Sequence, residues 1–417
     1  MPREGLRSPR QAANPVQHEL EAQPACMTTE IIAEAEALPR LTELSYAIAC
    51  DKERNLIFLY KEDAGAALAR VFQLDVADPE NVRCKELTHE LYHRSAKSSH
   101  CAQDEQRHLP ALNQPCLGSI YLNGRHFLIV WGGARLTATG GIEELSSNLI
   151  TIDTEAKRWS IEEVRGVPGI ARFWACMAVV DRKLFIFDGF DQQDVDLKTD
   201  CQHRRLASYS CIEFIETADA KYWQWVDVDV PYPHNVGPSR FEYATPIANG
   251  SKILLTPCIK SPLNGGGRFS TVTPADFLWT FDVGQRTFTV LDSIQGRLPK
   301  NLSCYHPWCF NSLVPQPDAL NPPDILLICS WETTNAGAFI RLPKLYKLVS
   351  NDWNDAEMEQ LKVDVPLKAA LGQATYMSNF IVINERVILL GTSDPQKAFD
   401  DMELDVALFI PLNWIGL

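Results

Sequence analysis

The sequence predicts an all-β fold, a six-bladed β-propeller of four-stranded antiparallel blades. Two repeated patterns predict it. Six times along the chain, two short apolar runs flank a polar turn, usually of two to four residues, which is typical of a β-hairpin. After each hairpin, a third apolar run ends in an acidic or polar turn, and in every unit but the first an aromatic residue opens a fourth run. Four strands in each of six repeats is the arrangement of a propeller.

The hairpins provide the first and second strands of each unit. The units start near residues 45, 116, 174, 243, 308 and 375, a spacing of roughly 57–72 residues. The first strands are expected at 45–50, 116–122, 174–180, 243–248, 308–314 and 375–383. The second strands are expected at 55–60, 127–131, 183–188, 252–256, 324–329 and 387–391.

The later runs provide the third and fourth strands. The third strands are expected at 70–75, 148–153, 209–215, 277–282, 345–348 and 406–410. In the first unit the fourth run, 83–87, has no aromatic residue. In the other units we expect the aromatic residue to pack between sheets, because large rings bury much area. These residues are Trp159, Trp223, Trp225, Phe288, Trp353 and Trp414.

The two ends of the chain complete the predicted domain. Residues 1–27 are rich in Pro, Gln, Ala and Arg and have no periodicity, so we expect them to be disordered. The propeller then spans 28–417, and translation could start at Met1 or at Met27. The last unit ends soon after Trp414, so its outer strand is either short or completed by residues 28–38. Alternatively, 28–38 forms a short helix, because Glu and Ala dominate it.

Composition excludes several classes of protein. A net charge of −14 argues against a general nucleic-acid binder, which needs cations to displace the counterions of phosphate. No apolar run approaches the length of a membrane span. The 12 cysteines of the 417 residues are scattered singly, without a CxxC pair. No apolar segment follows the arginines near the N-terminus, so we expect no secretory signal and a cytoplasmic protein.

Two motifs give the chain a resemblance to a known family. Trp131-Gly132-Gly133 closes a second strand, and the next unit has Asp188-Gly189-Phe190 in the same place. The segments 168–172 and 238–240 come just before the first strands of the third and fourth units, and they look like the family's entry to that strand. With these features the sequence resembles the kelch family over about residues 40–417, and only the unit with Gly132 and Gly133 keeps the family's diglycine. The resemblance implies a kelch-type propeller, and it leaves the function open because kelch-like propellers serve many roles.

The longest connections are predicted to meet on one face. Second-to-third strand connections and connections between blades leave the same side of a propeller. Here these are long, and the connections of the opposite side are short turns. Long connections in compact domains are commonly functional. Seven of the 9 histidines fall in the long connections, namely His89, His93, His100, His108, His203, His234 and His306. The sequence therefore predicts a binding site on the face with the long connections.

The residues before and within the first strands should line the mouth of the central channel. An aromatic and cationic mouth suits a small, planar, oxygenated ligand. Trp131 and Trp331 end second strands and are expected to flank the same rim. The alternative for the two arginines is that they tie neighbouring blades together. The candidate ligand-binding residues are Arg172, Trp174, Arg240, Tyr243, Tyr305, Trp131 and Trp331.

One loop carries a candidate metal site. Asp196, Asp200 and His203 lie close together in the third unit's long connection. This spacing resembles the Glu, Asp and His set of nitrile-specifier proteins, which are kelch-like and bind ferrous iron. Carboxylate and imidazole suit iron or manganese. This sequence departs from that set because it has Asp in place of Glu and a shorter interval before the His. The alternative interpretation is a solvated acidic loop without a metal. Elsewhere we expect no cofactor.

Two functions of different classes fit these patterns. The chain resembles stand-alone, divergent fungal kelch-repeat proteins, some of which accompany polyketide enzymes. This resemblance implies a propeller that binds a small oxygenated metabolite and assists a cyclisation, isomerisation or ring rearrangement. His306 would then be the acid–base group, and Arg172 and Arg240 would stabilise an enolate or carboxylate. The alternative is a protein–protein scaffold that docks a partner on the same face. No hydrolase, kinase or dehydrogenase motif is present, so whether it is an enzyme stays open.

Overall fold

The computed structural model describes the strands of the predicted propeller and the turns near them. The described residues are 46–63, 68–78, 82–93, 108–137, 142–191, 205–233, 241–257, 278–291, 293–296, 310–314, 324–330, 344–351, 353, 355–361, 376–383, 386–392 and 406–412. The predictions for residues 1–27, residues 28–38 and Trp414 lie outside this part of the chain. Within it, the elements are strands and two short 3-10 helices, η1 (Thr88–Glu90) and η2 (Ala248–Gly250). The expected all-β class is confirmed.

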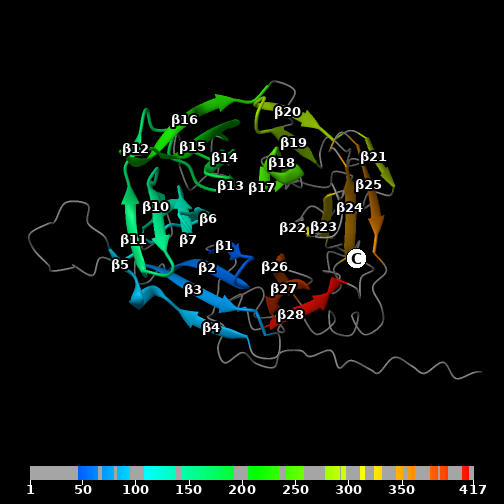
Figure 1. The fold of residues 1–417 in the computed structure, drawn as a ribbon, viewed down its shortest axis with the longest axis horizontal. Coiled ribbons are helices and arrows are strands. Elements are labelled where there is room, and N and C mark those ends of the chain that lie inside the picture. The colour runs from blue at the N-terminus through cyan, green and yellow to red at the C-terminus, as the bar shows by residue number, and fades with distance from the viewer. Residues whose placement is uncertain are drawn as a thin grey trace, which may run out of the picture.

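The first three sheets follow one another around a ring (Figure 1). Sheet 1 contains β1 (Tyr46–Asp51), β2 (Leu56–Asp63), β3 (Leu68–Asp75) and β4 (Arg83–Glu86). Sheet 2 contains β6 (Cys116–Leu122), β7 (Arg125–Trp131), β10 (Leu149–Asp153), β11 (Arg158–Glu162) and β5 (Tyr92–His93). Sheet 3 contains β13 (Cys176–Val180), β14 (Lys183–Phe187), β15 (Ser208–Glu216), β16 (Lys221–Pro231) and β12 (Val164–Arg165).

The remaining sheets complete the propeller-like arrangement. Sheet 4 contains β17 (Phe241–Ile247), β18 (Lys252–Pro257), β19 (Trp279–Asp282) and β20 (Thr287–Val290). Sheet 5 contains β22 (Phe310–Val314), β23 (Asp324–Ser330), β24 (Lys344–Ser350), β25 (Asp355–Gln360) and β21 (Ser293–Gly296). Sheet 6 has three described strands, β26 (Tyr376–Ile383), β27 (Arg386–Thr392) and β28 (Val406–Pro411). A separate hairpin pairs β8 (Ala134–Leu136) with β9 (Ile142–Leu145).

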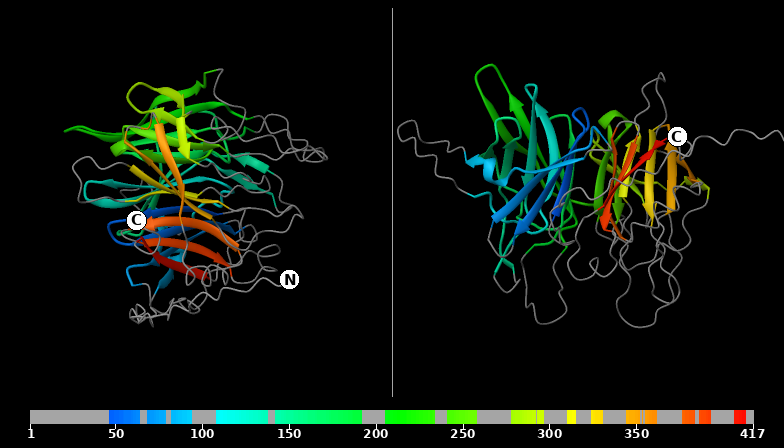
Figure 2. Two further views of the ribbon diagram at one scale, coloured as in Figure 1. Left: turned by 90° about the vertical axis from the view of Figure 1, so that its right-hand side faces the viewer. Right: turned by 90° about the horizontal axis from the view of Figure 1, so that it is seen from below.

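The first strand of each sheet lies nearest the centre of the ring (Figure 1). Successive first strands contact one another, from β1 to β6, β13, β17, β22 and β26. The second, third and fourth strands follow outward in antiparallel pairing in sheets 1 to 5, and sheet 6 shows the second and third in the described part of the chain. Figure 2 shows the strands running between the two faces of the ring. The ring therefore has a face where the short turns lie and a face where the long connections begin and end.

Three sheets carry an outer strand that the sequence did not predict. The chain that leaves the fourth strand of one sheet adds a short parallel strand to the outer edge of the next sheet. In this way β5 pairs with β11, β12 with β16, and β21 with β25. These strands are too short to show a periodic pattern in the sequence. They form because the chain pairs with the fourth strand of the next sheet. They cover edges that would otherwise present unpaired backbone groups.

The hydrophobic core lies between neighbouring sheets. One cluster joins sheets 1 and 2 and contains Phe58, Leu128 and Trp159. Others join sheets 2 and 3 and sheets 3 and 4. A further cluster joins sheet 6 to sheet 1, so the last described sheet packs against the first. The predicted core role is confirmed for Trp159, Trp223, Trp225 and Trp353, which are buried, and Phe288 packs, partly buried, against the cluster between sheets 3 and 4.

Candidate functional site

The long connections join the ends of described strands on one side of the ring, which we call the long-connection face. Second strands end there at Trp131, Phe187, Pro257, Ser330 and Thr392, and antiparallel third strands begin beside them. The opposite side, the turn face, has the short turns between first and second strands and between third and fourth strands. The candidate ligand-binding residues that the structure describes, Arg172, Trp174, Tyr243 and Trp131, lie at or near the strand ends of the long-connection face.

Arg172 is the best-defined of these candidates, and it is fully buried. It precedes β13, on the long-connection face of sheet 3. Its Nη1 donates to the backbone oxygen of Asp188 at 2.9 Å, and its Nε donates to that of Ile170 at 3.3 Å. Its Nη2 forms an ion pair with Asp229 on β16. Burial lowers the pKa of the Arg172 guanidinium, and the Asp229 carboxylate acts in the opposite direction.

This geometry favours a structural role for Arg172. Its side chain bonds connect parts of sheet 3, and its backbone oxygen accepts the N–H of Gly133 from sheet 2 at 2.9 Å. It therefore ties its own sheet together with its side chain and reaches the neighbouring sheet with its backbone. Contact between the guanidinium and a ligand stays a prediction.

Asp188 makes a second buried tie on the same face. Its carboxylate accepts from Arg205 at 2.5 Å and 3.1 Å. It also accepts from the backbone N–H of Phe241, the first residue of β17, at 2.8 Å. Sheet 3 is thus bonded to sheet 4 through a residue of the Asp188-Gly189-Phe190 motif. The sequence shows this motif, but it does not predict that Arg205 and the Phe241 N–H donate to Asp188.

Aromatic side chains gather just before β13. The rings of Phe173 and Trp174 lie 5.4 Å apart, and Phe190 lies 5.9 Å and 6.0 Å from them. We call these three residues the Trp174 cluster. Phe173 and Phe190 are buried, and Trp174 is half-buried. Partly buried side chains of the β8–β9 hairpin, Leu136, Ile142 and Leu145, pack against it.

The backbone of Trp174 adopts a left-handed conformation with φ 54°. Gln114 takes the same conformation, φ 50°, at the matching place before β6. The N–H of Trp174 donates to the backbone oxygen of Gln114 at 3.3 Å. The conformation therefore recurs in two neighbouring sheets, and such a backbone is costly for residues other than glycine.

The other candidates divide into buried, partly exposed and undescribed residues. Trp131 is fully buried between sheets 2 and 3, 6.3 Å from the ring of Trp225, which favours packing over ligand contact. Tyr243 on β17 is partly exposed. The remaining candidates lie outside the described residues, and their binding, acid–base and metal roles stay predictions: Arg240, Tyr305, His306, Trp331, Asp196, Asp200 and His203. In the described part of the chain, no group of three or more His, Cys, Asp or Glu could hold a metal ion.

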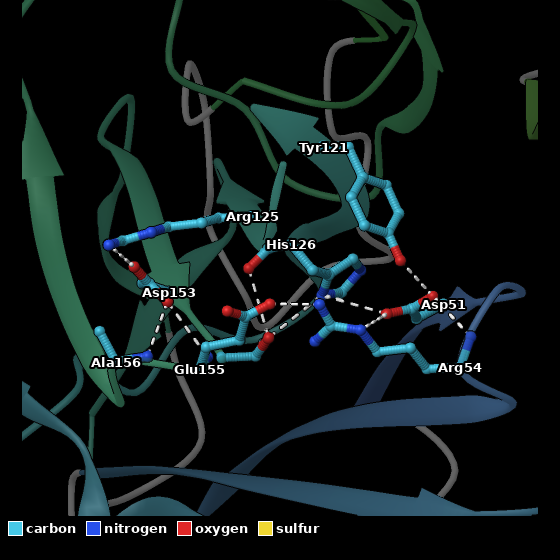
Figure 3. A network of polar contacts seen from close by, with 9 residues as sticks. Asp51, Arg54, Tyr121, Arg125, His126, Asp153, Glu155 and Ala156 are labelled. Carbon is cyan, nitrogen blue, oxygen red and sulfur yellow. Dashed lines mark hydrogen bonds and ion pairs between the residues drawn. The ribbon is translucent and has the colours of Figure 1, made fainter. Parts of the chain in front are cut away.

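A polar network that sequence reasoning missed lies on the turn face between sheets 1 and 2 (Figure 3). The Tyr121 hydroxyl donates to Asp51 Oδ1 at 2.5 Å, which joins the ends of β6 and β1. The backbone N–H of Arg54 donates to the same oxygen at 3.1 Å. Arg54 also forms an ion pair with Glu155 in the β10–β11 turn. His126, on β7, lies buried beside these groups. The histidine lies outside the long connections, and nothing in the sequence pairs it with residues so far away.

Removing the Tyr121 hydroxyl should weaken this contact between the sheets. We expect Tyr121→Phe to lower the free energy of unfolding by about 1–2 kcal/mol, because a hydrogen bond to a buried carboxylate is lost. Tyr222→Phe in β16 is the matched control, since the Tyr222 ring stacks under Arg165 at 3.7 Å and keeps that contact without its hydroxyl. Denaturant unfolding of the two variants measures the difference. Equal stability of the two variants would contradict the assigned role of the Tyr121 hydroxyl.

Comparison with known proteins gives the fold and no family. No family model matches the chain, and no curated protein matches it. The chain is similar to a solved structure of RAG in complex with one melted RSS and one unmelted RSS. The TM-score is 0.52 and the identity 12%, over 90% of this chain and 97% of that chain. It is also similar to the structure of YjhT, with TM-score 0.48 and 10% identity over 88% of this chain and 96% of that chain.

The protein has a β-propeller-like fold. At 12% identity the likeness concerns the fold alone and carries no statement about activity, partner or ligand. Within the described ranges, no helix is long and apolar enough to cross a membrane.

Proposed function

We propose that the protein is a kelch-like six-bladed propeller that binds a small oxygenated metabolite on its long-connection face. Each of the six sheets would be one blade. The bound molecule would be guided through a cyclisation, isomerisation or ring rearrangement in a biosynthetic pathway of the fungal polyketide kind. His306 would act as the acid–base group and Arg240 would stabilise an enolate or carboxylate.

The Trp174 cluster is the observation that carries this proposal. It is a hydrophobic cluster separate from the cores between sheets, and it lies where the chain enters the first strand of sheet 3. Its indole is half-buried and stacks on the ring of Phe173. Rings of this kind provide much of the contact area in small-molecule sites.

A protein partner is the second candidate, and a separate observation favours it. The connection between β12 and β13 carries Val167 and Ile170, whose exposed fractions are 73% and 43%. The backbone N–H of Ile170 donates to Asp229 at 2.8 Å, so this apolar segment is fixed on the face. Fixed and exposed apolar side chains suit docking to another protein.

Native mass spectrometry of protein purified from its own host separates the two candidates. Spectra are recorded before and after organic extraction of the wild type and of two variants. Trp174→Gln introduces the residue that stands at the matching place in sheet 2, and Tyr121→Phe changes the turn face only. A bound organic molecule that is lost in Trp174→Gln and kept in Tyr121→Phe supports the metabolite site. A stoichiometric protein partner without a small molecule would replace that proposal with the scaffold, and a small molecule kept in both variants would exclude the Trp174 cluster as its site.

A further inference from the structure

His126 occupies an unusual position for an ionisable side chain. It stands near the start of β7, paired in register with Tyr121 of β6, and its side chain is fully buried. Its ring stacks on Phe58 of β2 at 5.4 Å and meets the edge of Tyr121 at 5.2 Å. The imidazole is therefore enclosed between sheet 1 and sheet 2.

Two buried polar atoms at this place have no hydrogen-bond partner among the described residues. These are Nε2 of His126 and Oδ2 of Asp51. The other ring nitrogen, Nδ1, lies 3.3 Å from Thr154 Oγ1 and 4.0 Å from Asp51 Oδ2. The ring thus has one hydrogen bond and one unpaired nitrogen in a site closed to water. A neutral imidazole suits this site, because a buried charge needs a hydrogen-bonded partner.

Polar and charged groups from several elements lie around the imidazole (Figure 3). Asp51 comes from β1, and the β1–β2 turn brings Arg54, whose Nε lies 3.7 Å from Asp51 Oδ2. The β10–β11 turn brings Asp153 and Glu155; Arg54 pairs with Glu155, and Arg125 of β7 pairs with Asp153 at 3.3 Å. Tyr121 from β6 donates to Asp51. Asp51 Oδ1 already accepts from the Tyr121 hydroxyl and the Arg54 N–H. Asp51 Oδ2 lies 3.7 Å from Arg54 Nε and 4.0 Å from His126 Nδ1, so an imidazolium would compete with Arg54 for this oxygen.

We propose that His126 is an acid-sensitive latch between sheets 1 and 2. The neutral ring holds the β1–β2 turn, the β6–β7 hairpin and the β10–β11 turn together. Protonation places a cation beside Arg54 in a closed site and drives the local opening of this contact on the turn face. The proposal is independent of the ligand assigned to the opposite face.

The direction of the pH effect follows from where the ring is exposed to water. Burial is the main cause that lowers the pKa of His126, and Arg54 acts in the same direction, whereas Asp51 and Glu155 raise it. In the opened contact the ring reaches water and regains a pKa of about 6.5. The open form then binds more protons than the closed form. Below about pH 6.5, each pH unit should increase the opening constant about tenfold until the ring titrates in the closed form as well.

Hydrogen exchange measured by mass spectrometry tests the latch on the full chain between about pH 7.5 and pH 5. After correction for intrinsic exchange rates, we expect protection at 51–58 and 119–128 to fall about tenfold per pH unit below pH 6.5. The β19–β20 turn in sheet 4 provides the internal control and should not change. His126→Gln cannot titrate, so its protection should stay constant over the same range.

Three outcomes would overturn the proposal. If hydrogen-exchange protection in the wild type does not change with pH, the proposal is wrong. If protection falls equally in His126→Gln, carboxylates and not His126 cause the effect. Protection that rises on acidification means that the imidazolium pairs with Asp51 and closes the contact. If His126→Gln fails to fold, the ring titration of His126 in the wild type by NMR decides, and a pKa at or above the usual value contradicts the latch.

Discussion

Replacing Arg172 with methionine is expected to lower the free energy of unfolding by about 3–5 kcal/mol, because it leaves Asp229 without its buried partner. The backbone oxygens of Asp188 and Ile170 lose their donors at the same time. Methionine keeps most of the volume of the arginine chain, so the loss reports the polar bonds and not a cavity. Denaturant unfolding monitored by tryptophan fluorescence measures the change.

Arg182→Met is the matched control for this substitution. Arg182 belongs to the same sheet and pairs with Glu216 at 3.1 Å, but its side chain is 48% exposed. Exposed pairs of this kind contribute about 0–1 kcal/mol. A double mutant with Asp229→Asn should recover part of the loss seen in Arg172→Met, because no uncompensated buried charge remains. If Arg172→Met costs no more than Arg182→Met, the assigned structural role of the guanidinium is wrong.

Gly132→Ala is expected to lower the free energy of unfolding by about 2–4 kcal/mol. Gly132 has φ +72°, and a Cβ there would lie 2.7 Å from the backbone oxygen of Arg172. That oxygen accepts the Gly133 N–H at 2.9 Å, so the added methyl group would push sheets 2 and 3 apart at their backbone contact. Thermal and denaturant unfolding of the variant test the expectation.

Gly124→Ala is the control that separates the cost of crowding at Gly132 from the cost of the left-handed backbone conformation. Gly124 has nearly the same φ, +73°, and a Cβ there would meet nothing within 4 Å. We expect only the conformational cost, about 1 kcal/mol. A similar loss in both variants would mean that the diglycine is required for its φ alone and not for the approach of the neighbouring sheet.

The strands could be predicted because hairpin turns and apolar runs are local signals. Residues 183–188 were expected as a second strand and β14 spans Lys183–Phe187. Residues 116–122 were expected as a first strand and β6 spans Cys116–Leu122. The Asn123-Gly124 turn between such runs suits a two-residue hairpin, and both residues have positive φ. Local chemistry therefore sufficed to place the sheets.

The bonding of the candidate site could not be predicted, because it depends on which strands become neighbours. An arginine before a first strand has the same sequence context whether it binds a ligand or ties a sheet, and only the position of Asp229 on β16 separates the two. Trp131 was expected at the rim, and its side chain points instead into the core between sheets 2 and 3. The β8–β9 hairpin lies inside a segment that was expected to be a long loop.

The turn-face network is the clearest case of this limit. Asp51, Tyr121 and His126 come from the ends of three strands in two sheets. Taken singly, each is an ordinary residue beside a turn. Their contact follows from the register of β6 with β7, which the Asn123-Gly124 turn sets, and from the packing of β1 against β6, which leaves no pattern in the sequence.

Hydrogen exchange tests most directly whether a small molecule binds on the long-connection face. The extracted protein is measured with and without its extracted molecule added back. We predict increased protection near Trp174 and the β8–β9 hairpin, and no change at the β6–β7, β13–β14 and β19–β20 turns on the opposite side. Protection confined to those turns would contradict the claim, and so would the absence of any protected segment.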